Sequence, residues 1–362
     1  MTNDCRLDVT AGRKTNLTDS NYDTAWEPSN AEDTITVTLP EGRNGALITL
    51  EWMRAPSSFV VALAGSEGGA IRTIVEDNES GMLSFAYDLT NDVRQIVIST
   101  SDTQNGICEL RVMEEGRVSE VTQRWQPIEG KVDLMIFAAH EDDELLYFGG
   151  TIPYYVAQGK NVVVVYMADC GRARYAEALS ALWTCGLKTH PIFLNFEDKD
   201  LNDYEKTVNL WGLEEIEAAV VELIRKYQPD VVVTHDIDGE YGHNQHKLTS
   251  YAVRRAVMLA TDPESYPASY EDYGLWDVKK AYIHLYDGNQ LTMTAYDEPM
   301  DALNGLTPTQ VATIAYSKYV SRQKRHNIVS EGVRYDNRVY GLIRTTVGDD
   351  EAHNDFFENI EE

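Results

Sequence analysis

The chain has 362 residues, a hydrophobic fraction of 43% and a formal net charge of −28, from 59 acidic and 31 basic side chains. Such a surface repels phosphate backbones and anionic lipid headgroups, so nucleic acids and membrane surfaces are poor partners. No stretch approaches the roughly 20 apolar residues of a membrane helix, and the opening MTNDCRLDVT lacks the apolar segment of a signal peptide. These features predict two globular domains. They leave open a cytoplasmic location or, after removal of a signal peptide, a secreted or cell-surface one.

The first part of the chain, residues 1–125, has the pattern of an all-β domain. Short runs rich in β-branched and aromatic residues are separated by Gly, Asn, Asp or Pro, which predicts a β-sandwich. Cys5 and Cys108 flank this region, and the pattern fits either a disulfide between them or two reduced, buried thiols. The predicted strands are 33–40, 46–52, 59–65, 82–89, 95–101 and 108–115.

The remainder, residues 126–362, follows a linker and has an alternating pattern of strands and helices. Continuous apolar strands with helices between them predict a Rossmann-like α/β domain, with a mostly parallel sheet covered on both faces. The predicted strands are 132–140, 161–169, 191–196, 230–237 and 279–286, and the predicted helices lie near 144–158, 173–185, 213–228, 243–260 and 307–323.

Histidines and acids gather directly after two of these strands. The first strand ends at His140, followed by the acids 141–144, and the fourth ends at His235, followed by DIDGEYGHNQH with His243 and His246. If the two strands are neighbours, these side chains converge at the carboxyl edge of the sheet, where ligands bind. Two imidazoles and a carboxylate with an open position form a usual catalytic zinc site, and Fe²⁺ accepts similar ligands. The alternative is a solvated helix cap and an unrelated pair of histidines.

The segments AAHEDDE and THDIDGEYGHNQH together resemble the paired signatures of the PIG-L (LmbE-like) zinc de-N-acetylases, which usually read A-H-P-D-D-E and G-H-P-D-H. The resemblance covers about residues 130–260 and extends to about 345. It implies a metal-dependent hydrolase that removes acetyl from an N-acetylated amino sugar of the N-acetylglucosamine type, with Zn²⁺ or Fe²⁺ as cofactor.

The resemblance also implies roles for individual residues. His140, Asp143 and His246 are the implied metal ligands. Asp142 is the implied general base toward the metal-activated water, and His243 the catalytic histidine at the oxyanion or at the departing amine.

Further residues are implied around the substrate. Tyr241 corresponds to a tyrosine that contributes to oxyanion stabilisation, and Arg174 and Asp198 are the implied contacts to the sugar. Glu177 stands in register with Arg174 in an R-x-x-E segment, and Glu144 is expected to orient a ligand or to cap the helix.

The sequence departs from the family pattern at two places. Glu141 replaces the usual proline, and Asn244 and Gln245 stand where relatives often have Pro and Asp. A neutral Gln245 is expected to lower the pKa of His243. A protein with a degenerate site that only binds carbohydrate is therefore the alternative function, and a metallophosphoesterase, which would need ligands for two metals, is a third.

The N-terminal region carries a second resemblance. LTDSNYDTAWEP (17–28), followed by short strands, resembles the discoidin-like, galactose-binding sandwich. This implies sugar binding and a structural Ca²⁺, and such a module would hold the enzyme near a polymeric glycan by raising its effective concentration. The alternative is a scaffold domain with Trp26 in its core.

Overall fold

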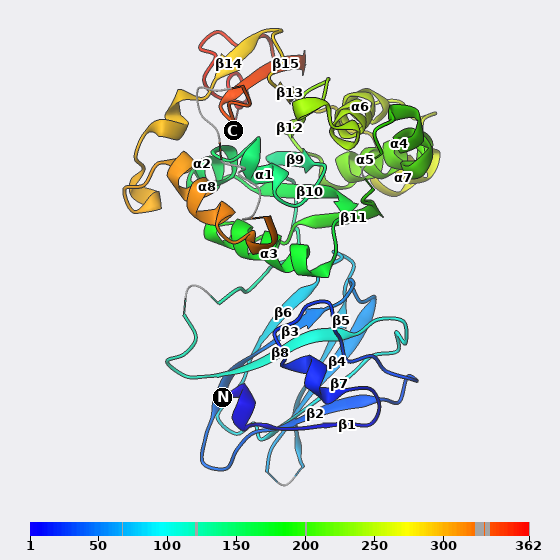
Figure 1. The fold of residues 1–362 in the computed structure, drawn as a ribbon, viewed down its shortest axis with the longest axis vertical. Coiled ribbons are helices and arrows are strands. Elements are labelled where there is room, and N and C mark those ends of the chain that lie inside the picture. The colour runs from blue at the N-terminus through cyan, green and yellow to red at the C-terminus, as the bar shows by residue number, and fades with distance from the viewer. Residues whose placement is uncertain (67, 120–121, 200, 323–328, 330–333, 362) are drawn as a thin grey trace. The chain divides into compact units, whose positions relative to one another are not determined.

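The computed structural model describes residues 1–362 except 67, 120–121, 200, 323–328, 330–333 and 362 (Figure 1). The chain divides into two compact units. Unit 1 consists of Met1–Pro127 and Gly171–Ala176, and unit 2 consists of Ile128–Cys170 and Glu177–Glu362.

Unit 1 is built from two antiparallel sheets. Residues of β2 and β4 alternate between buried and half-buried, because successive side chains of a strand point to opposite faces. Phe59 contacts Trp52 and Phe85 at ring-centroid distances of 4.9 and 4.8 Å, so side chains of the two sheets meet in one core. The five-stranded sheet has the order β1 (Arg6–Val9), β2 (Thr34–Thr38), β7 (Gln95–Ser99), β4 (Ser58–Ala64), β5 (Ala70–Asp77), and the three-stranded sheet the order β6 (Ser84–Asp88), β3 (Gly45–Trp52), β8 (Ile107–Glu114).

Two strands of unit 1 were not expected, and the structure decides between the two alternatives for its cysteines. β1 and β5 were not predicted; β5 is mostly exposed and therefore lacks a regular apolar alternation. Cys5 and Cys108 do not form a disulfide, so the alternative of two reduced thiols holds, with Cys5 half-buried and Cys108 buried.

Unit 2 is built around one mixed sheet. Its parallel part confirms the predicted strands. The sheet has the order β11 (Ile192–Glu197), β10 (Val162–Asp169), β9 (Leu134–Ala138), β12 (Val231–Thr234), β13 (Lys280–His284), β15 (Val339–Thr345), β14 (Gln290–Thr292), and the last two strands are antiparallel. The residues of β9, β10, β12 and β13 are buried almost without interruption, as expected of a sheet covered on both faces, whereas those of the edge strand β11 are half-buried or exposed.

The strand order reverses between β9 and β12. The chain runs outward from β9 to β11 and then returns to place β12 on the other side of β9, where Thr234 pairs with Phe137. Ligands of open α/β sheets bind at such a switch point, beyond the carboxyl ends of the strands. The expectation that these two strands are neighbours is confirmed.

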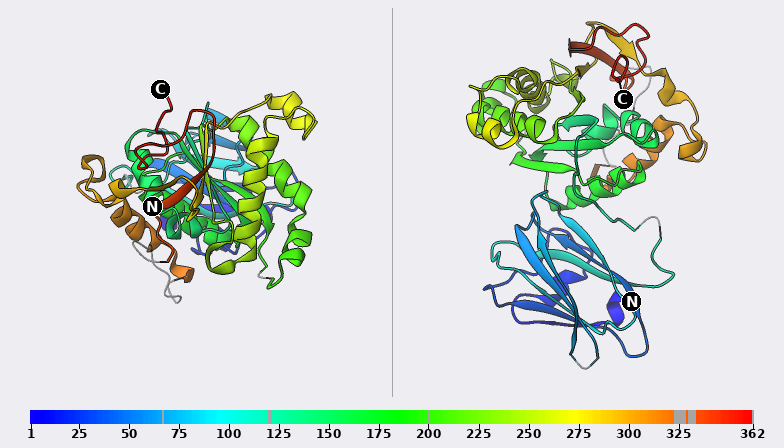
Figure 2. Two further views of the ribbon diagram at one scale, coloured as in Figure 1. Left: turned by 90° about the horizontal axis from the view of Figure 1, so that it is seen from above. Right: turned by 180° about the vertical axis from the view of Figure 1, so that it is seen from behind.

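Helices cover both faces of this sheet (Figure 2). One group packs together on one face: α4 (Tyr204–Trp211), α5 (Leu213–Tyr227), α6 (Asn244–Leu259) and α7 (Pro267–Tyr273). The other face carries α1 (Asp143–Leu146), α2 (Thr151–Ala157) and α8 (Pro308–Tyr316), while α3 (Arg172–Thr184) spans the division between the units. Short 3₁₀ helices are η1 (Thr2–Asp4), η2 (Lys14–Leu17), η3 (Glu240–Gly242), η4 (Thr294–Asp297), η5 (Asp301–Leu303) and η6 (Val320–Arg322).

Two predicted helices are shorter than expected. The helix predicted near 144–158 breaks into α1 and α2 at Gly149 and Gly150, where the ring of Tyr296 approaches so closely that a Cβ on Gly150 would lie 2.4 Å from it. The helix predicted at 307–323 starts with a Thr307–Gln310 capping box but ends at Tyr316; residue 323 lies outside the described residues.

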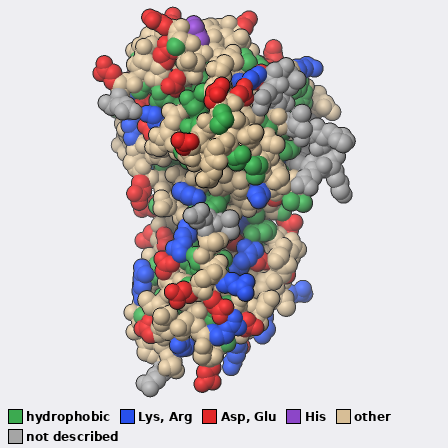
Figure 3. Space-filling view, turned by 90° about the vertical axis from the view of Figure 1, so that its left-hand side faces the viewer, with side chains coloured by type: hydrophobic (Ala, Val, Ile, Leu, Met, Phe, Trp, Pro, Cys, Tyr) green, Lys and Arg blue, Asp and Glu red, His purple; other side chains and the backbone are tan. Residues whose placement is uncertain are grey.

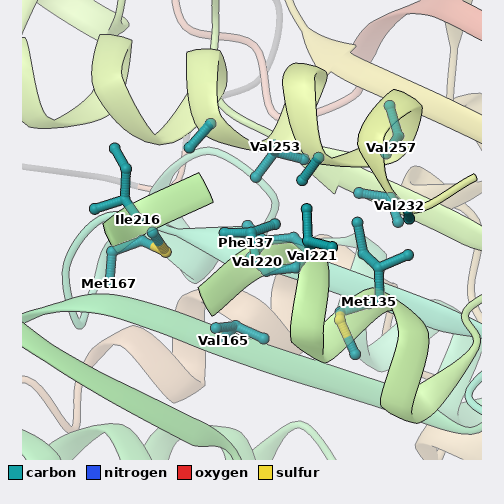
Figure 4. Packing of buried hydrophobic residues seen from close by; sticks show 14 of the residues in the cluster. Met135, Phe137, Val165, Met167, Ile216, Val220, Val221, Val232, Val253 and Val257 are labelled. Atoms are coloured by element: carbon teal, nitrogen blue, oxygen red, sulfur yellow. The ribbon is translucent and has the colours of Figure 1, made fainter. Parts of the chain in front are cut away.

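The main core of unit 2 lies between the sheet and α5 and α6 (Figure 4). Phe137, Val165 and Val232 of the sheet face Val220 and Val253 of these helices, and all five are essentially buried. This packed layer holds β9 and β12 in fixed register and thereby fixes the loops that follow them.

Two further features concern possible partners: the distribution of charge on the surface and the length of the helices. On the face shown in Figure 3, basic side chains are interspersed with acidic ones. Among the described helices, none is both long and apolar enough to cross a bilayer.

Candidate metal centre

The loops after β9 and β12 bring the predicted site residues together. His140 follows β9 and His235 follows β12. The backbone N–H of Ala139 donates a hydrogen bond to His235 Nε2 at 2.9 Å, which ties the two loops to each other. The switch point of the sheet therefore positions the site.

The three predicted metal ligands form a compact triangle. Asp143 Oδ2 lies 3.0 Å from His140 Nδ1 and 3.2 Å from His246 Nε2, and the two imidazole nitrogens are 3.3 Å apart. All three residues are buried. Metal–ligand bonds of about 2.0–2.2 Å in a tetrahedron separate ligand atoms by roughly 3.3 Å, so this triangle has the dimensions of one face of a zinc site.

Hydrogen bonds behind the two imidazoles leave the facing nitrogens able to bind a cation. His140 Nε2 lies 2.8 Å from Gln245 Oε1, and the Gln245 amide nitrogen donates to the Glu197 carbonyl at 3.2 Å, which fixes the direction of the amide. His246 Nδ1 lies 2.7 Å from Glu240 Oε2. Because both partners are acceptors, these ring nitrogens each carry a proton. His140 Nδ1 and His246 Nε2 are therefore the nitrogens whose lone pairs a cation in the triangle would use in place of protons, as in metal sites.

Without a cation, protons hold the cluster together. Burial alone would lower the pKa of His246, but Asp143 and Glu240 raise it to about 10. The pKa of Asp143 is well below its usual value, since the charges of His246 and His140 outweigh its burial. A divalent cation can replace these protons, so the donor set fits the group that the sequence implies.

His235 belongs to a second geometric group with Asp143 and His246. Its Nε2 accepts the Ala139 N–H, so its proton is on Nδ1, which faces Glu240 at 2.7 Å. Both ring nitrogens are thus engaged, and His235 has no lone pair left for a metal ion.

His243 stands beside the triangle. Its ring centroid is 4.9 Å from that of His140 and 4.7 Å from that of His246. Its buried Nδ1 has no hydrogen-bond partner among the described residues. Burial and the charges of His246 and His140 lower its pKa to about 3, so the ring is neutral. The direction of this shift is the expected one, and Gln245 itself contacts His140.

Asp142 has an unusual backbone conformation. Its φ of 128° is in a region that non-glycine residues rarely adopt, and the residue is buried. Its N–H donates to Glu144 Oε2 at 2.9 Å, and Glu144 Oε1 accepts the hydroxyl of Tyr319 at 2.5 Å. Glu144 therefore holds the turn that carries Asp142. Such strain persists only where the surroundings enforce it, often at functional sites.

The residues predicted near the substrate differ in their exposure and in their distance from the histidine cluster. Tyr241 is 57% exposed, and its ring lies 5.6 Å from His243. Asp198 is exposed, with Oδ1 3.8 Å from His140 Nε2. Arg174 is buried in the first turn of α3, and its segment groups with unit 1 rather than with the cluster. Glu177 accepts two hydrogen bonds from Ser321.

Two buried residues of the site were missed by the sequence reasoning. Glu240 accepts hydrogen bonds from His235 and His246, and also from His284 Nδ1 at 2.7 Å. His284 ends β13, the neighbour of β12 in the sheet. A histidine at the end of a third strand was the available signal, since the carboxyl ends of parallel strands share one edge.

Comparisons with known proteins agree with the two motifs. Residues 135–257 match the family model described as PIG-L: GlcNAc-PI de-N-acetylase. The 1D-myo-inositol 2-acetamido-2-deoxy-alpha-D-glucopyranoside deacetylase 1 of Catenulispora acidiphila is 30% identical over 179 residues, which cover 41% of this chain and 54% of that protein. The corresponding deacetylase of Rhodococcus opacus is 33% identical over 180 residues, covering 41% and 60%.

A solved structure is also similar. The N,N'-diacetylchitobiose deacetylase from Pyrococcus horikoshii shares 20% identity at a TM-score of 0.40, covering 52% of this chain and 70% of that one. The chain spans little more than half the length of the curated relatives described above. The resemblance expected from the two motifs is confirmed: residues 135–257 match the PIG-L family model.

Proposed function

We propose that unit 2 is a metal-dependent de-N-acetylase that removes acetyl from an N-acetylated amino sugar of the N-acetylglucosamine type. The observation that carries the proposal is the triangle of His140 Nδ1, Asp143 Oδ2 and His246 Nε2, with separations of 3.0, 3.2 and 3.3 Å. The matching relatives, deacetylases of a 2-acetamido sugar linked to inositol, support the substrate class.

The three residues would hold Zn²⁺, or Fe²⁺, with at least one position left for water and substrate. A dication bound there polarises the amide carbonyl and lowers the pKa of water toward 7. Asp142, the neighbour of Asp143 in the chain, accepts the proton of the attacking water. It then delivers this proton to the amide nitrogen, which must be protonated to leave as an amine.

His243 and Tyr241 complete the reaction site in this proposal. His243 is neutral and has a buried ring nitrogen that can donate to the oxyanion of the tetrahedral intermediate. The exposed Tyr241 hydroxyl is the second donor on that side. Asp198, at the exposed edge near His140, is the proposed partner of sugar hydroxyls. Sugar or Ca²⁺ binding by the N-terminal domain stays a prediction.

The proposal is tested by metal analysis and an acetate-release assay over N-acetylated sugars. We expect roughly one metal per chain, acetate release by the wild type, and at least about a hundredfold lower kcat in Asp142→Asn with metal content retained. Asp272→Asn, which removes an exposed carboxylate on α7, is the matched control and should keep full activity.

Other results would favour other functions. Sugar binding by the metal-loaded wild type without any acetate release would favour the carbohydrate-binding alternative. Two metals per chain would favour a phosphoesterase. Full activity in Asp142→Asn would contradict the assigned base.

A further inference from the structure

We propose that Glu240 is a positioning residue for the metal site: it fixes the tautomer and the orientation of His246 and is itself held in place by His284 and His235. The inference rests on the proposed function only in taking His246 as a metal ligand. It gives a function to Glu240 and His284. The family motifs assign no role to either side chain in this chain.

The contacts of Glu240 come from three separate segments. Its Oε2 faces His235 Nδ1 and His246 Nδ1, each at 2.7 Å. Its Oε1 faces His284 Nδ1 at 2.7 Å and accepts the backbone N–H of Asp236 at 3.2 Å. Glu240 and the three histidines have 0% relative exposure, so no solvent competes for these bonds.

These contacts fill the acceptor capacity of Glu240. An ionised carboxylate offers about four lone-pair sites, and four N–H groups point at them. Glu240 therefore has no site left for a metal ion or for a substrate proton. Any effect on catalysis must pass through a neighbour, and only His246 among its three imidazole partners has its other nitrogen in the triangle of predicted ligand atoms.

His284 holds Glu240 in place through a buried hydrogen bond. Its Nδ1 faces Glu240, and its Nε2 lies 3.0 Å from the backbone carbonyl of Asp336, which can only accept. The ring therefore lies between the Glu240 carboxylate and this carbonyl, with one nitrogen at hydrogen-bond distance from each. Rings of Tyr147, Phe148 and Tyr340 surround His284 at 5.8–5.9 Å. Removing one partner of such a buried hydrogen bond is costly, because it leaves the other group unsatisfied.

The consequence for the site is geometric. The bond to Glu240 keeps the proton of His246 on Nδ1, so the lone pair of Nε2 points toward His140 Nδ1 and Asp143 Oδ2. Outer partners of this kind set the orientation and basicity of ligand histidines, and their loss typically weakens metal binding 10–100-fold. Metal affinity should therefore depend on a residue that never touches the metal.

The test compares zinc affinity in Glu240→Gln, His284→Gln and the wild type, measured by competition with a chromophoric chelator. We expect the zinc Kd to rise about 10- to 100-fold in Glu240→Gln and by a smaller factor, about tenfold, in His284→Gln. Glu217→Gln is the matched control: Glu217 is a buried glutamate on α5 that pairs with Arg255 at 3.4 Å, and its loss should leave the Kd unchanged.

A second readout reports the hydrogen bond itself. In zinc-loaded wild type, NMR should show a strongly hydrogen-bonded imidazole N–H from His246 Nδ1. This signal should vanish or shift in Glu240→Gln and persist in Glu217→Gln. A merely structural role would lower thermal stability without changing this signal or the Kd.

The outcomes separate this inference from the proposed function. A wild-type zinc Kd in Glu240→Gln overturns the inference and leaves the deacetylase proposal standing. If Glu240→Gln does not fold by circular dichroism, an unchanged Kd in His284→Gln overturns it. A wild type that binds zinc but releases acetate from no sugar contradicts the proposed function alone. A wild type that binds no zinc contradicts both.

Discussion

Unit 1 and unit 2 each bury an aspartate, but the two side chains have different kinds of partner. In unit 1, Asp33 accepts the Thr10 hydroxyl at 2.8 Å and the backbone N–H groups of Ser29 and Asn30 at 2.8 and 2.9 Å. These are mostly local donors of a single turn. The carboxylate is satisfied by the backbone that it stabilises, so its burial needs no function.

In unit 2, Asp143 has partners that the local chain does not explain. Its Oδ2 accepts the N–H of His140 at 2.9 Å, and it also faces ring nitrogens of His140, His246 and His235 at 3.0–3.6 Å. Several ring nitrogens converge on one oxygen from segments a hundred residues apart. Burial of an acid is therefore not itself a sign of function; convergence of potential ligand atoms on it is.

The largest expected effect comes from exchanging each aspartate for asparagine. Asp143→Asn should weaken zinc binding by at least about 100-fold, because losing a ligand costs more than losing an outer partner. Asp33→Asn should lower the melting temperature and leave the zinc Kd unchanged. Chelator competition and thermal melts check both. A wild-type zinc Kd in Asp143→Asn would show that Asp143, like Asp33, does not contribute to metal binding.

The second prediction tests whether a loss of core packing in unit 1 changes metal binding in unit 2. Ile98 of β7 is fully buried in unit 1. Ile98→Ala should lower the free energy of unfolding by about 2–5 kcal/mol, the usual cost of a truncated core side chain. Denaturant unfolding measures this loss. The zinc Kd of the folded protein should not change; a large change would mean that the site depends on the core of unit 1.

A smaller effect concerns the turn that carries Asp142. Tyr319→Phe removes the hydroxyl that bonds Glu144, which leaves a buried carboxylate with one donor fewer. This costs about 1–3 kcal/mol, and we expect roughly a tenfold lower kcat with an unchanged zinc Kd. Tyr282→Phe removes a comparable buried bond to Asp350 and is the control. Equal kcat values in the two variants would remove the assigned role of Glu144.

The smallest effect is a pH dependence of unit 1. The hydrogen bond from Thr10, aided by Ser29 and Asn30, holds the pKa of Asp33 below its usual value of 3.8. Below pH about 4 the unfolded chain binds this proton more readily than the folded one, so the contribution of Asp33 to stability is present above that pH and is lost as the pH falls through the lower folded pKa. Thermal melts of wild type and Asp33→Asn should converge in acid. A constant difference would contradict the assignment.

The sequence predicted the parts of unit 2 whose signal is local. Apolar runs marked β9, β10 and β12, and their ends marked the edge where His140 and Asp143 stand. The sequence did not predict the elements whose sequence pattern is short or absent. The helices α4 and α7 have only 8 and 7 residues, and the antiparallel strands β14 and β15 lie beyond the repeating strand–helix pattern.

Only those features of the site that follow from the order of residues along the chain could be predicted. The spacing of His140 to Asp143 and of His243 to His246 could be read directly. The contact of Glu240 with His284 depends on β12 and β13 being neighbours, which no local pattern encodes. For the same reason, the contact of Gln245 with His140, 105 positions away, could not be predicted from the chain order.

The most direct test of the account is a crystal structure of the zinc-soaked protein with anomalous data collected at the zinc edge. We predict a single anomalous peak about 2.0–2.2 Å from His140 Nδ1, Asp143 Oδ2 and His246 Nε2. A peak bound through other residues, or no peak while the three side chains keep their present positions, would contradict the proposed metal site.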